Sequence, residues 1–383
     1  MTEKKFLQGF WAALVSFGLV ALVLQLLLTK VGEIGLAGVV DRQLAAPDGA
    51  VLFSSAINQH AYPYKMMLFD KVKPEVIAIG SSRAMQVKGQ FFSAGFINLG
   101  GATNNIAELE LLAGHLAAAK PLPRLVFLIL DPWWFNDRYP DSTAVAQIPD
   151  FAKIISVDLV WEAAKGFRHG NWIAKSFKSH DLGIYALLAD EGFSRDGSFN
   201  YVGILTGEHP STDVKFSDTL ARIAGDSQRF QKNSQPDPAL VSRMCRVVAS
   251  LKKSAGHLVV IAPPFSNAVW HRMMQGGYGY IAKANAALRA CSPETEFFDF
   301  GNPASVAGST ECEFVDGFHG GDVTYARMLS QIAAADPETR KYLRTGFVKQ
   351  FIERYRDHAG GGMNLEIHPS LKEVDFLKLG CRK

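Results

Sequence analysis

The residues from Phe6 to Thr29 form an apolar stretch that contains no charged side chain. As a helix, a stretch of this length extends about 36 Å, which is enough to cross a hydrocarbon core of about 30 Å. Lys4 and Lys5 precede the stretch and Lys30 follows it. This slight charge bias favours an N-terminus inside the cell and a chain that continues outside. The pattern predicts a membrane-spanning helix within residues 1–30.

A cleavable signal peptide is the competing interpretation of this N-terminus. Its apolar core is about 7–15 residues long, and a small-x-small cleavage site follows closely. The apolar stretch here is longer, and the residues from Lys30 to Glu33 offer no such site. We therefore expect an uncleaved signal anchor that contacts the inner membrane through residues 6–29, with one span and a large domain in the periplasm.

The composition excludes several classes of protein. Lys plus Arg number 40 and Asp plus Glu 37, so the net charge of +3 lacks the basic excess of a dedicated nucleic-acid binder. Apolar residues make up 48% of the chain, which excludes a largely disordered protein. The four cysteines form no Cys-x-x-Cys pair and the histidines show no metal-ligand spacing, so we expect neither a metal nor another cofactor. Cys291 and Cys312 flank the last predicted strand, where they either pair in an oxidising compartment or stay free.

Beyond the anchor, short apolar runs alternate with amphipathic segments. Fully apolar strands between helices indicate a parallel sheet that is covered on both faces. The expected fold class is therefore α/β, a doubly wound, flavodoxin-like sheet in three α/β/α layers, which binds its ligands at the carboxyl ends of the strands. The predicted strands are 76–80, 96–100, 125–130, 258–262 and 297–300, and the predicted helices are 105–119, 239–255, 280–290 and 322–335.

The strength of this pattern varies along the chain and suggests a domain organisation. We expect residues 31–70 to form a stalk and lead-in, and residues 71–340 to form the α/β domain. Between residues 138 and 238 the pattern weakens, which predicts an inserted cap or substrate-facing region. Residues 341–383 form a tail that the pattern does not assign.

A serine follows the first predicted strand, in the segment from Gly80 to Arg83. A turn between a buried strand and a helix places the Ser82 hydroxyl at the ligand edge of the sheet. Backbone N–H groups at the start of the following helix would face the same point and favour an anion. Arg83 is positioned to hold an anionic group of a substrate or to form a structural ion pair. Taken alone, the segment is more typical of a polar turn that caps a helix.

Asp316 and His319 follow the last predicted strand. A carboxylate three residues before a histidine can hold the imidazole Nδ1–H and stabilise the imidazolium that forms when the ring accepts a proton. Serine needs such a base, because its hydroxyl is a weak nucleophile at neutral pH. By itself an Asp-x-x-His pair also occurs by chance on protein surfaces.

Two further segments lie at predicted strand ends. Asn98-Leu99-Gly100 ends the second strand, where the Gly100 N–H is a candidate donor to an oxyanion. The segment from Asp131 to Asn136 follows the strongest strand. Its adjacent Trp133 and Trp134 would either line a binding site for a sugar or acyl chain or pack beneath the inserted region.

Together, these blocks resemble the SGNH (GDSL-like) hydrolase family. Gly80-Ser81-Ser82 is similar to the family's nucleophile block, Asn98-Leu99-Gly100 to its oxyanion-glycine block, and Asp316 with His319 to its last block. The family usually has Gly-x-Asn-Asp in the third block, whereas here Asn136 comes later than expected. The resemblance covers about residues 74–135 and 239–335.

The segment from Asp131 to Asn136 is instead similar to the Ser-Pro-Gln-Trp-Phe segment of the D-alanyl-transfer proteins of teichoic acid operons. Those proteins are also SGNH-like and are anchored by one N-terminal helix. Other anchored members accompany membrane-bound O-acyltransferases and modify cell-envelope polysaccharides. The resemblance thus implies a membrane-anchored esterase or acyltransferase that acts on the O-acyl groups of a glycan.

In the mechanism that this resemblance implies, Ser82 is the nucleophile, His319 the base and Asp316 the residue that orients it. The oxyanion donors are the N–H groups of Ser82 and Gly100 and the amide of Asn136, and Arg83, Trp133 and Trp134 contact the substrate. The departure in the third block keeps a second hypothesis open, namely a catalytically weak accessory that binds polysaccharide or serves as a scaffold for a membrane acyltransferase.

Overall fold

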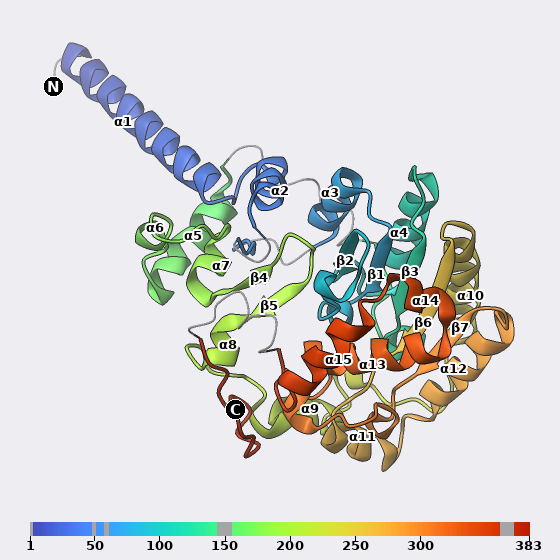
Figure 1. Ribbon diagram of the computed structural model, residues 1–383. Coiled ribbons are helices and arrows are strands. Elements are labelled where there is room, and N and C mark those ends of the chain that lie inside the picture. Colours follow the sequence, from blue (N-terminus) through green and yellow to red (C-terminus); the bar gives the residue numbers. More distant parts are fainter. Residues whose placement is uncertain (1–2, 48–50, 57–60, 144–154, 361–370) are drawn as a thin grey trace. The chain divides into compact units, whose positions relative to one another are not determined.

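The computed structural model describes residues 3–47, 51–56, 61–143, 155–360 and 371–383. The chain divides into two compact units (Figure 1). The anchor unit comprises Met1–Gln59 and Pro149–Gly192, and the sheet unit comprises His60–Ile148 and Phe193–Lys383. The region predicted as one insertion, 138–238, is therefore shared between the two units. In the same way, the predicted stalk ends inside the sheet unit.

Five parallel strands form the sheet of the sheet unit. Their order, β2-β1-β3-β6-β7, is that of a doubly wound sheet of the flavodoxin type. The chain turns outward in opposite directions from β1, so the switch point lies between β1 and β3, where such sheets bind ligands. The strands are β1 (Val76–Gly80), β2 (Phe96–Gly100), β3 (Leu125–Ile129), β6 (His257–Ala262) and β7 (Glu296–Asp299). The predicted parallel α/β sheet is thus present, with strand ends that differ by at most one residue.

The two faces of the sheet are covered by different parts of the chain. Alternate strand residues such as Ala78, Phe127 and Ile261 pack in one cluster with side chains of α13 (Asp322–Ala335) and α15 (Thr345–Arg354). Because strand side chains alternate, the intervening residues point to the opposite face. The helices α4 (Ile106–Ala118), α10 (Pro238–Lys253) and α12 (Gly279–Cys291) pack in series beside that face (Figure 1).

The sequence signals for α4 act as predicted. The Asn105 side chain accepts a hydrogen bond of 2.9 Å from the Glu108 N–H and thereby caps the first turn.

The remaining helices and strands of the sheet unit are short. They are α3 (Tyr62–Val72), α8 (Val202–Thr206), α9 (Ser217–Ala224), α11 (Asn267–Met274), α14 (Pro337–Tyr342) and β5 (Phe199–Tyr201), while β4 (Glu191–Phe193) spans the boundary of the units.

The C-terminal region, which the sequence pattern did not assign, belongs to the core. Leu343, Val348, Phe351 and Tyr355 are buried in the same cluster as the strand residues. Val348 and Phe351 belong to α15, which lies against α13 (Figure 1). The α/β domain therefore extends past the predicted boundary at residue 340.

Two disulfide bonds join Cys245 to Cys291 and Cys312 to Cys381. The pairing of Cys291 with Cys312, one of the two expectations, is therefore wrong, as is the expectation that they stay free. The expectation rested on the closeness of Cys291 and Cys312 to β7 in the sequence. In the fold, Cys291 lies beside α10 and Cys312 lies beside the C-terminal segment.

The anchor unit is helical. Its first helix, α1 (Glu3–Lys30), has a mean hydropathy of 2.3 in its most apolar window and is long enough to cross a membrane. The C-terminal end of α1 packs in a cluster with side chains from the later segment, including Leu159, Trp172 and Leu187. The other helices of the unit are α2 (Leu36–Ala45), α5 (Val157–His169), α6 (Trp172–Lys175) and α7 (Ile184–Ala189).

Candidate active site

Ser82 lies directly after β1, at the start of a short 3₁₀ turn, Ser82–Ala84. The turn requires glycine at position 80, because Gly80 has a φ of +150° and a Cβ there would lie 2.7 Å from the carbonyl oxygen of Ile129. Ser81 then stabilises the turn, since its hydroxyl accepts a hydrogen bond from the Arg83 N–H. The Ser82 side chain is consequently presented, half-buried, at the carboxyl edge of the sheet.

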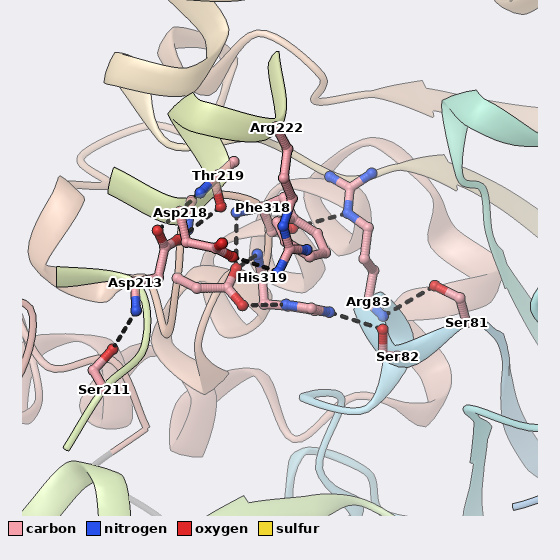
Figure 2. A network of polar contacts seen from close by, with 12 residues as sticks. Ser81, Ser82, Arg83, Ser211, Asp213, Asp218, Thr219, Arg222, Phe318 and His319 are labelled. Atoms are coloured by element: carbon pink, nitrogen blue, oxygen red, sulfur yellow. Dashed lines mark hydrogen bonds and ion pairs between the residues drawn. The ribbon is translucent and has the colours of Figure 1, made fainter. Parts of the chain in front are cut away.

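His319 meets Ser82 across 237 residues of sequence. The distance from Ser82 Oγ to His319 Nε2 is 2.8 Å, and His319 Nδ1 lies 2.6 Å from Asp316 Oδ2 (Figure 2). A carboxylate beside Nδ1 favours the tautomer with the proton on that nitrogen, which leaves Nε2 free to accept the serine proton. The three predicted catalytic residues therefore form one continuous chain of hydrogen bonds.

The Asp316 carboxylate is held ionised by its surroundings. Burial alone would raise its pKa, but the neighbouring His319 and the N–H groups of Phe318 and His319, both of which donate to Oδ1, lower the pKa below the ordinary value. The result is a fixed negative charge beside the imidazole. Such a charge stabilises the imidazolium that forms when His319 accepts a proton.

Arg83 stabilises the loop that carries the histidine, rather than facing a ligand. Its side chain is 1% exposed. Nε donates to the carbonyl oxygen of Phe318 at 2.9 Å, and Nη2 donates to the carbonyl oxygens of Pro263 and Pro264, which follow β6. Nη1 lies 3.7 Å from Asp131 at the end of β3. Arg83 thus ties three strand ends together, and its predicted contact with the substrate does not agree with this burial.

Asp213 is a further residue of this network that the sequence pattern did not reveal. It is buried, and its Oδ2 accepts hydrogen bonds from the Gly317 N–H at 2.9 Å and from Thr219 Oγ1 at 2.7 Å (Figure 2). Gly317 follows Asp316 directly, so this carboxylate helps to hold the loop that joins Asp316 to His319. Asp213 lies in the region where the pattern weakens, and no local motif marks it.

Two of the three predicted oxyanion donors are engaged elsewhere. The Gly100 N–H donates to Asn98 Oδ1 at 2.6 Å. The Asn136 side chain is buried and its Nδ2 donates to the carbonyl oxygen of Gln231 at 2.7 Å. Among the described residues, the N–H of Ser82 has no acceptor. Of the three predicted donors to an oxyanion, only the Ser82 N–H is therefore available in the structure.

The two tryptophans are packed beneath the site and do not form an open wall. Trp133 and Trp134 are both fully buried. The Trp133 ring meets the Phe318 ring edge-to-face at 6.0 Å, and Phe318 in turn lies 4.2 Å from the His319 ring. Trp134 Nε1 donates to the carbonyl oxygen of Asn104. Trp133 also lies 6.2 Å from the ring of Phe230, in the region predicted as an insertion, which agrees with the packing alternative considered above.

Within the described ranges, no group of three His, Cys, Asp or Glu side chains lies close enough to hold a metal ion. The chemistry that the geometry offers is proton removal from a serine hydroxyl by a histidine that a carboxylate orients. No protein-family model, curated protein or solved structure matches this chain in the comparisons with known proteins.

Proposed function

We propose that this protein is a membrane-anchored, extracytoplasmic serine esterase or acyltransferase of the SGNH type. The observation that carries the proposal is the continuous Ser82–His319–Asp316 chain, with distances of 2.8 Å and 2.6 Å. Each of its two contacts has the length of a formed hydrogen bond. The arrangement is that of an activated nucleophile with a base and a group that orients the base.

In the proposed reaction, Ser82 Oγ attacks the carbonyl carbon of an ester while His319 Nε2 takes the hydroxyl proton. The tetrahedral oxyanion accepts a hydrogen bond from the Ser82 N–H. When the intermediate collapses, the ester C–O bond breaks and the leaving alkoxide receives the proton from Nε2. The acyl group remains on Ser82 until water or a sugar hydroxyl attacks it and passes its proton to His319. The bond between the acyl carbon and Ser82 Oγ then breaks, and Oγ takes the proton back from Nε2. Asp316 stays ionised throughout.

Other observations support the SGNH assignment within this proposal. The five parallel strands follow the order expected for that fold, and the nucleophile and the Asp-x-x-His pair follow the first and the last strand of the sheet. The third block differs from the family's pattern, because the side-chain amide of Asn136 donates its hydrogen bond to the carbonyl oxygen of Gln231. The D-alanyl-transfer-like segment around Trp133 and Trp134 therefore remains the better comparison for that block.

The proposed location is the periplasmic side of the inner membrane. The helix α1 is long and apolar enough to span a bilayer once, and all four cysteines are paired, as is usual in an oxidising compartment. The proposed substrates are O-acyl groups of a cell-envelope polysaccharide or related glycan. The proposed partner is a membrane-bound O-acyltransferase that supplies or receives the acyl group.

The direct test is labelling of the full-length protein in detergent with a fluorophosphonate probe, which reacts with activated serines. We expect wild type and Ser81→Ala to label and Ser82→Ala to remain unlabelled. Ser81 is a matched control because it is the neighbouring serine, yet it bonds to Arg83 and not to His319. Labelling of Ser82→Ala at the wild-type rate would refute the assignment of the nucleophile.

A second candidate function is favoured by one observation, the engagement of Gly100 and Asn136 in other hydrogen bonds. Loss of a single oxyanion donor lowers the rate by roughly 10²–10³-fold. A domain with one donor would be a weak catalyst and would serve as a polysaccharide-binding or scaffolding accessory. A folded wild-type protein that neither labels nor hydrolyses p-nitrophenyl acetate would favour this candidate.

A further inference from the structure

The helix α5, Val157–His169, carries two apolar faces of which the fold uses one. Leu159, Ala163 and Gly166 are buried in the anchor unit. A second set of apolar side chains lies on an adjacent face and is exposed to solvent. We call this set the outer stripe, and its members are Val157, Val160, Trp161, Ala164 and Phe167.

The outer stripe is continuous along the helix. Its members recur at intervals of three and four residues, which places them on one side of a helix with 3.6 residues per turn. Val157 is 85% exposed and Trp161 is 61% exposed. The charged residues Asp158, Glu162 and Lys165 occupy a different arc of the same helix. Exposed apolar side chains arranged in this way mark a surface that meets another apolar phase.

The structure ties this helix to the end of α1. The Ile155 N–H, two residues before α5 begins, donates to the side-chain oxygen of Gln25 at 2.8 Å. In addition, Leu24 and Leu28 of α1 pack in the same cluster as Leu159 and Ala163 of α5. The start of α5 is thus held at the level of a residue inside the apolar stretch of α1.

This attachment sets the depth of α5 relative to a bilayer. Gln25 precedes Lys30 by five residues, or about 7 Å along the helix axis. About 20 residues of helix fill a hydrocarbon core, so the last turn of the apolar stretch extends into the polar boundary. If residues from Phe6 onward fill the core, Gln25 and the start of α5 lie at that boundary.

We propose that the outer stripe of α5 inserts into the outer boundary of the lipid bilayer and forms a second membrane contact beside α1. The occupant is lipid, because the buried face of α5 packs against the end of a helix that is itself long and apolar enough to span a membrane. Trp and Phe side chains are favoured at this depth, as they are in interfacial amphipathic helices.

Basic side chains lie where lipid headgroups would surround this contact. Arg168 follows the stripe at the last turn of α5. Lys30 ends α1, where its ammonium lies 3.4 Å from the centre of the exposed Phe177 ring. Such residues near the ends of apolar segments extend to the headgroups and attract anionic lipids.

The test uses the full-length protein in nanodiscs of phosphatidylcholine and phosphatidylglycerol, labelled with an NBD fluorophore at single introduced cysteines. Val157→Cys reports the outer stripe. Asp158→Cys is the matched control, because it is the neighbouring, exposed residue at the same depth on the polar arc. Val15→Cys, in the middle of α1, reports separately whether α1 spans the membrane.

We expect the label at Val157→Cys to be quenched by iodide several-fold less than the label at Asp158→Cys. We also expect lipids that carry a shallow spin label to quench it more than lipids that carry a deep one, with the reverse order at Val15→Cys. Equal iodide quenching at the two α5 positions would overturn the proposal. Protection from iodide without quenching by either lipid would also overturn it, because a second copy of the protein would then cover the stripe.

Discussion

The Asp213 carboxylate accepts a hydrogen bond of 2.9 Å from the N–H of Gly317, which lies between Asp316 and His319. The same carboxylate accepts hydrogen bonds from the N–H and the hydroxyl of Thr219, the latter at 2.7 Å. The loop that carries Asp316 and His319 is therefore held by a residue 104 positions earlier in the chain. Together with the bond that Arg83 donates to the carbonyl oxygen of Phe318, this contact helps to fix the position of the histidine.

Asp213→Asn should loosen the loop. Asparagine keeps one acceptor, but its amide would place a donor near donors that the carboxylate now satisfies. We expect the free energy of unfolding to fall by about 1–3 kcal/mol. Fluorophosphonate labelling should slow as well. Urea unfolding in detergent and labelling time courses would measure the two effects.

Asp218→Asn is the control for this prediction. Asp218 lies five residues later and pairs with Arg222 on the partly exposed α9. Loss of such a pair costs less than about 1 kcal/mol. If the two variants unfolded alike and labelled alike, Asp213 would have no special role in the loop.

Asp316→Asn should abolish most of the activity while leaving the fold intact. The amide removes the negative charge that stabilises the imidazolium, and it no longer favours the tautomer in which Nε2 accepts a proton. We expect kcat/KM for p-nitrophenyl acetate to fall roughly 10³–10⁴-fold, by analogy with other triads. A loss of less than about tenfold, in a variant that circular dichroism shows to be folded, would mean that Asp316 does not orient the base.

The stability of the sheet unit should decline in acid because two aspartates have lowered pKa values. Burial alone would raise the pKa of Asp336, but hydrogen bonds from Thr339 and His257 lower it, and His319 has the corresponding effect on Asp316. A lowered pKa in the folded state means that the stabilisation is complete above the ordinary pKa of about 3.9 and is lost as the pH falls through the lowered value.

Asp336→Asn tests this dependence. At pH 6 the variant should be less stable than the wild type by about 1–2 kcal/mol, because asparagine can still cap α14 but loses the charge-assisted hydrogen bond with His257. Its urea midpoint should then change less between pH 6 and pH 3 than that of the wild type. Parallel pH profiles for the two proteins would contradict the assignment.

Removal of the two disulfides should have different consequences. Cys245–Cys291 and Cys312–Cys381 close loops of 46 and 69 residues, for which chain entropy predicts about 4 kcal/mol each. Cys312 lies just before the loop with Asp316, whereas Cys245 lies on α10. We expect the double variant Cys312→Ser with Cys381→Ser to be less stable and also to label more slowly at Ser82. The double variant Cys245→Ser with Cys291→Ser should be less stable but label at the wild-type rate. The opposite ranking of labelling rates would be inconsistent with the loop assignment.

Two glycine-to-alanine substitutions should change the free energy of unfolding in opposite directions. Gly80→Ala places a Cβ against the backbone of Ile129 at a positive φ, so we expect a loss of at least about 2 kcal/mol in unfolding free energy. Gly114 lies within α4 with open space around the position of a Cβ. Gly114→Ala should therefore stabilise the protein by about 0.5–1 kcal/mol. Thermal melts of the two variants would test both predictions.

The sequence pattern predicted the sheet because its signals are local. The apolar run from Val76 to Gly80 and the Asn105 cap depend on neighbouring residues, and the structure contains both. The pairing of Ser82 with His319 also followed, since parallel strands end at one edge of the sheet.

The features that the sequence did not predict depend on distant contacts. The cysteine pairs depend on where α10 and the C-terminal segment lie in the fold, and the hydrogen bond between Asp213 and the histidine loop depends on a contact across 104 residues. The Gly100 N–H donates to the side chain of Asn98, only two residues away. The orientation of that side chain depends in turn on the hydrogen bond that Asn98 donates to the turn after Ser82. No spacing rule in one sequence reveals such contacts.

The burial of Leu28 has a practical consequence for making this protein. Removal of residues 1–30, the usual route to a version that needs no detergent, would delete a side chain with no exposed surface and leave Leu159, Trp172 and Leu187 facing water. It would also take away the Lys30 carbonyl that Arg42 binds. A useful truncation would begin before Leu24 and replace outward-facing residues such as Leu26 with polar ones, so that the last turns of α1 remain as an internal part of the folded product.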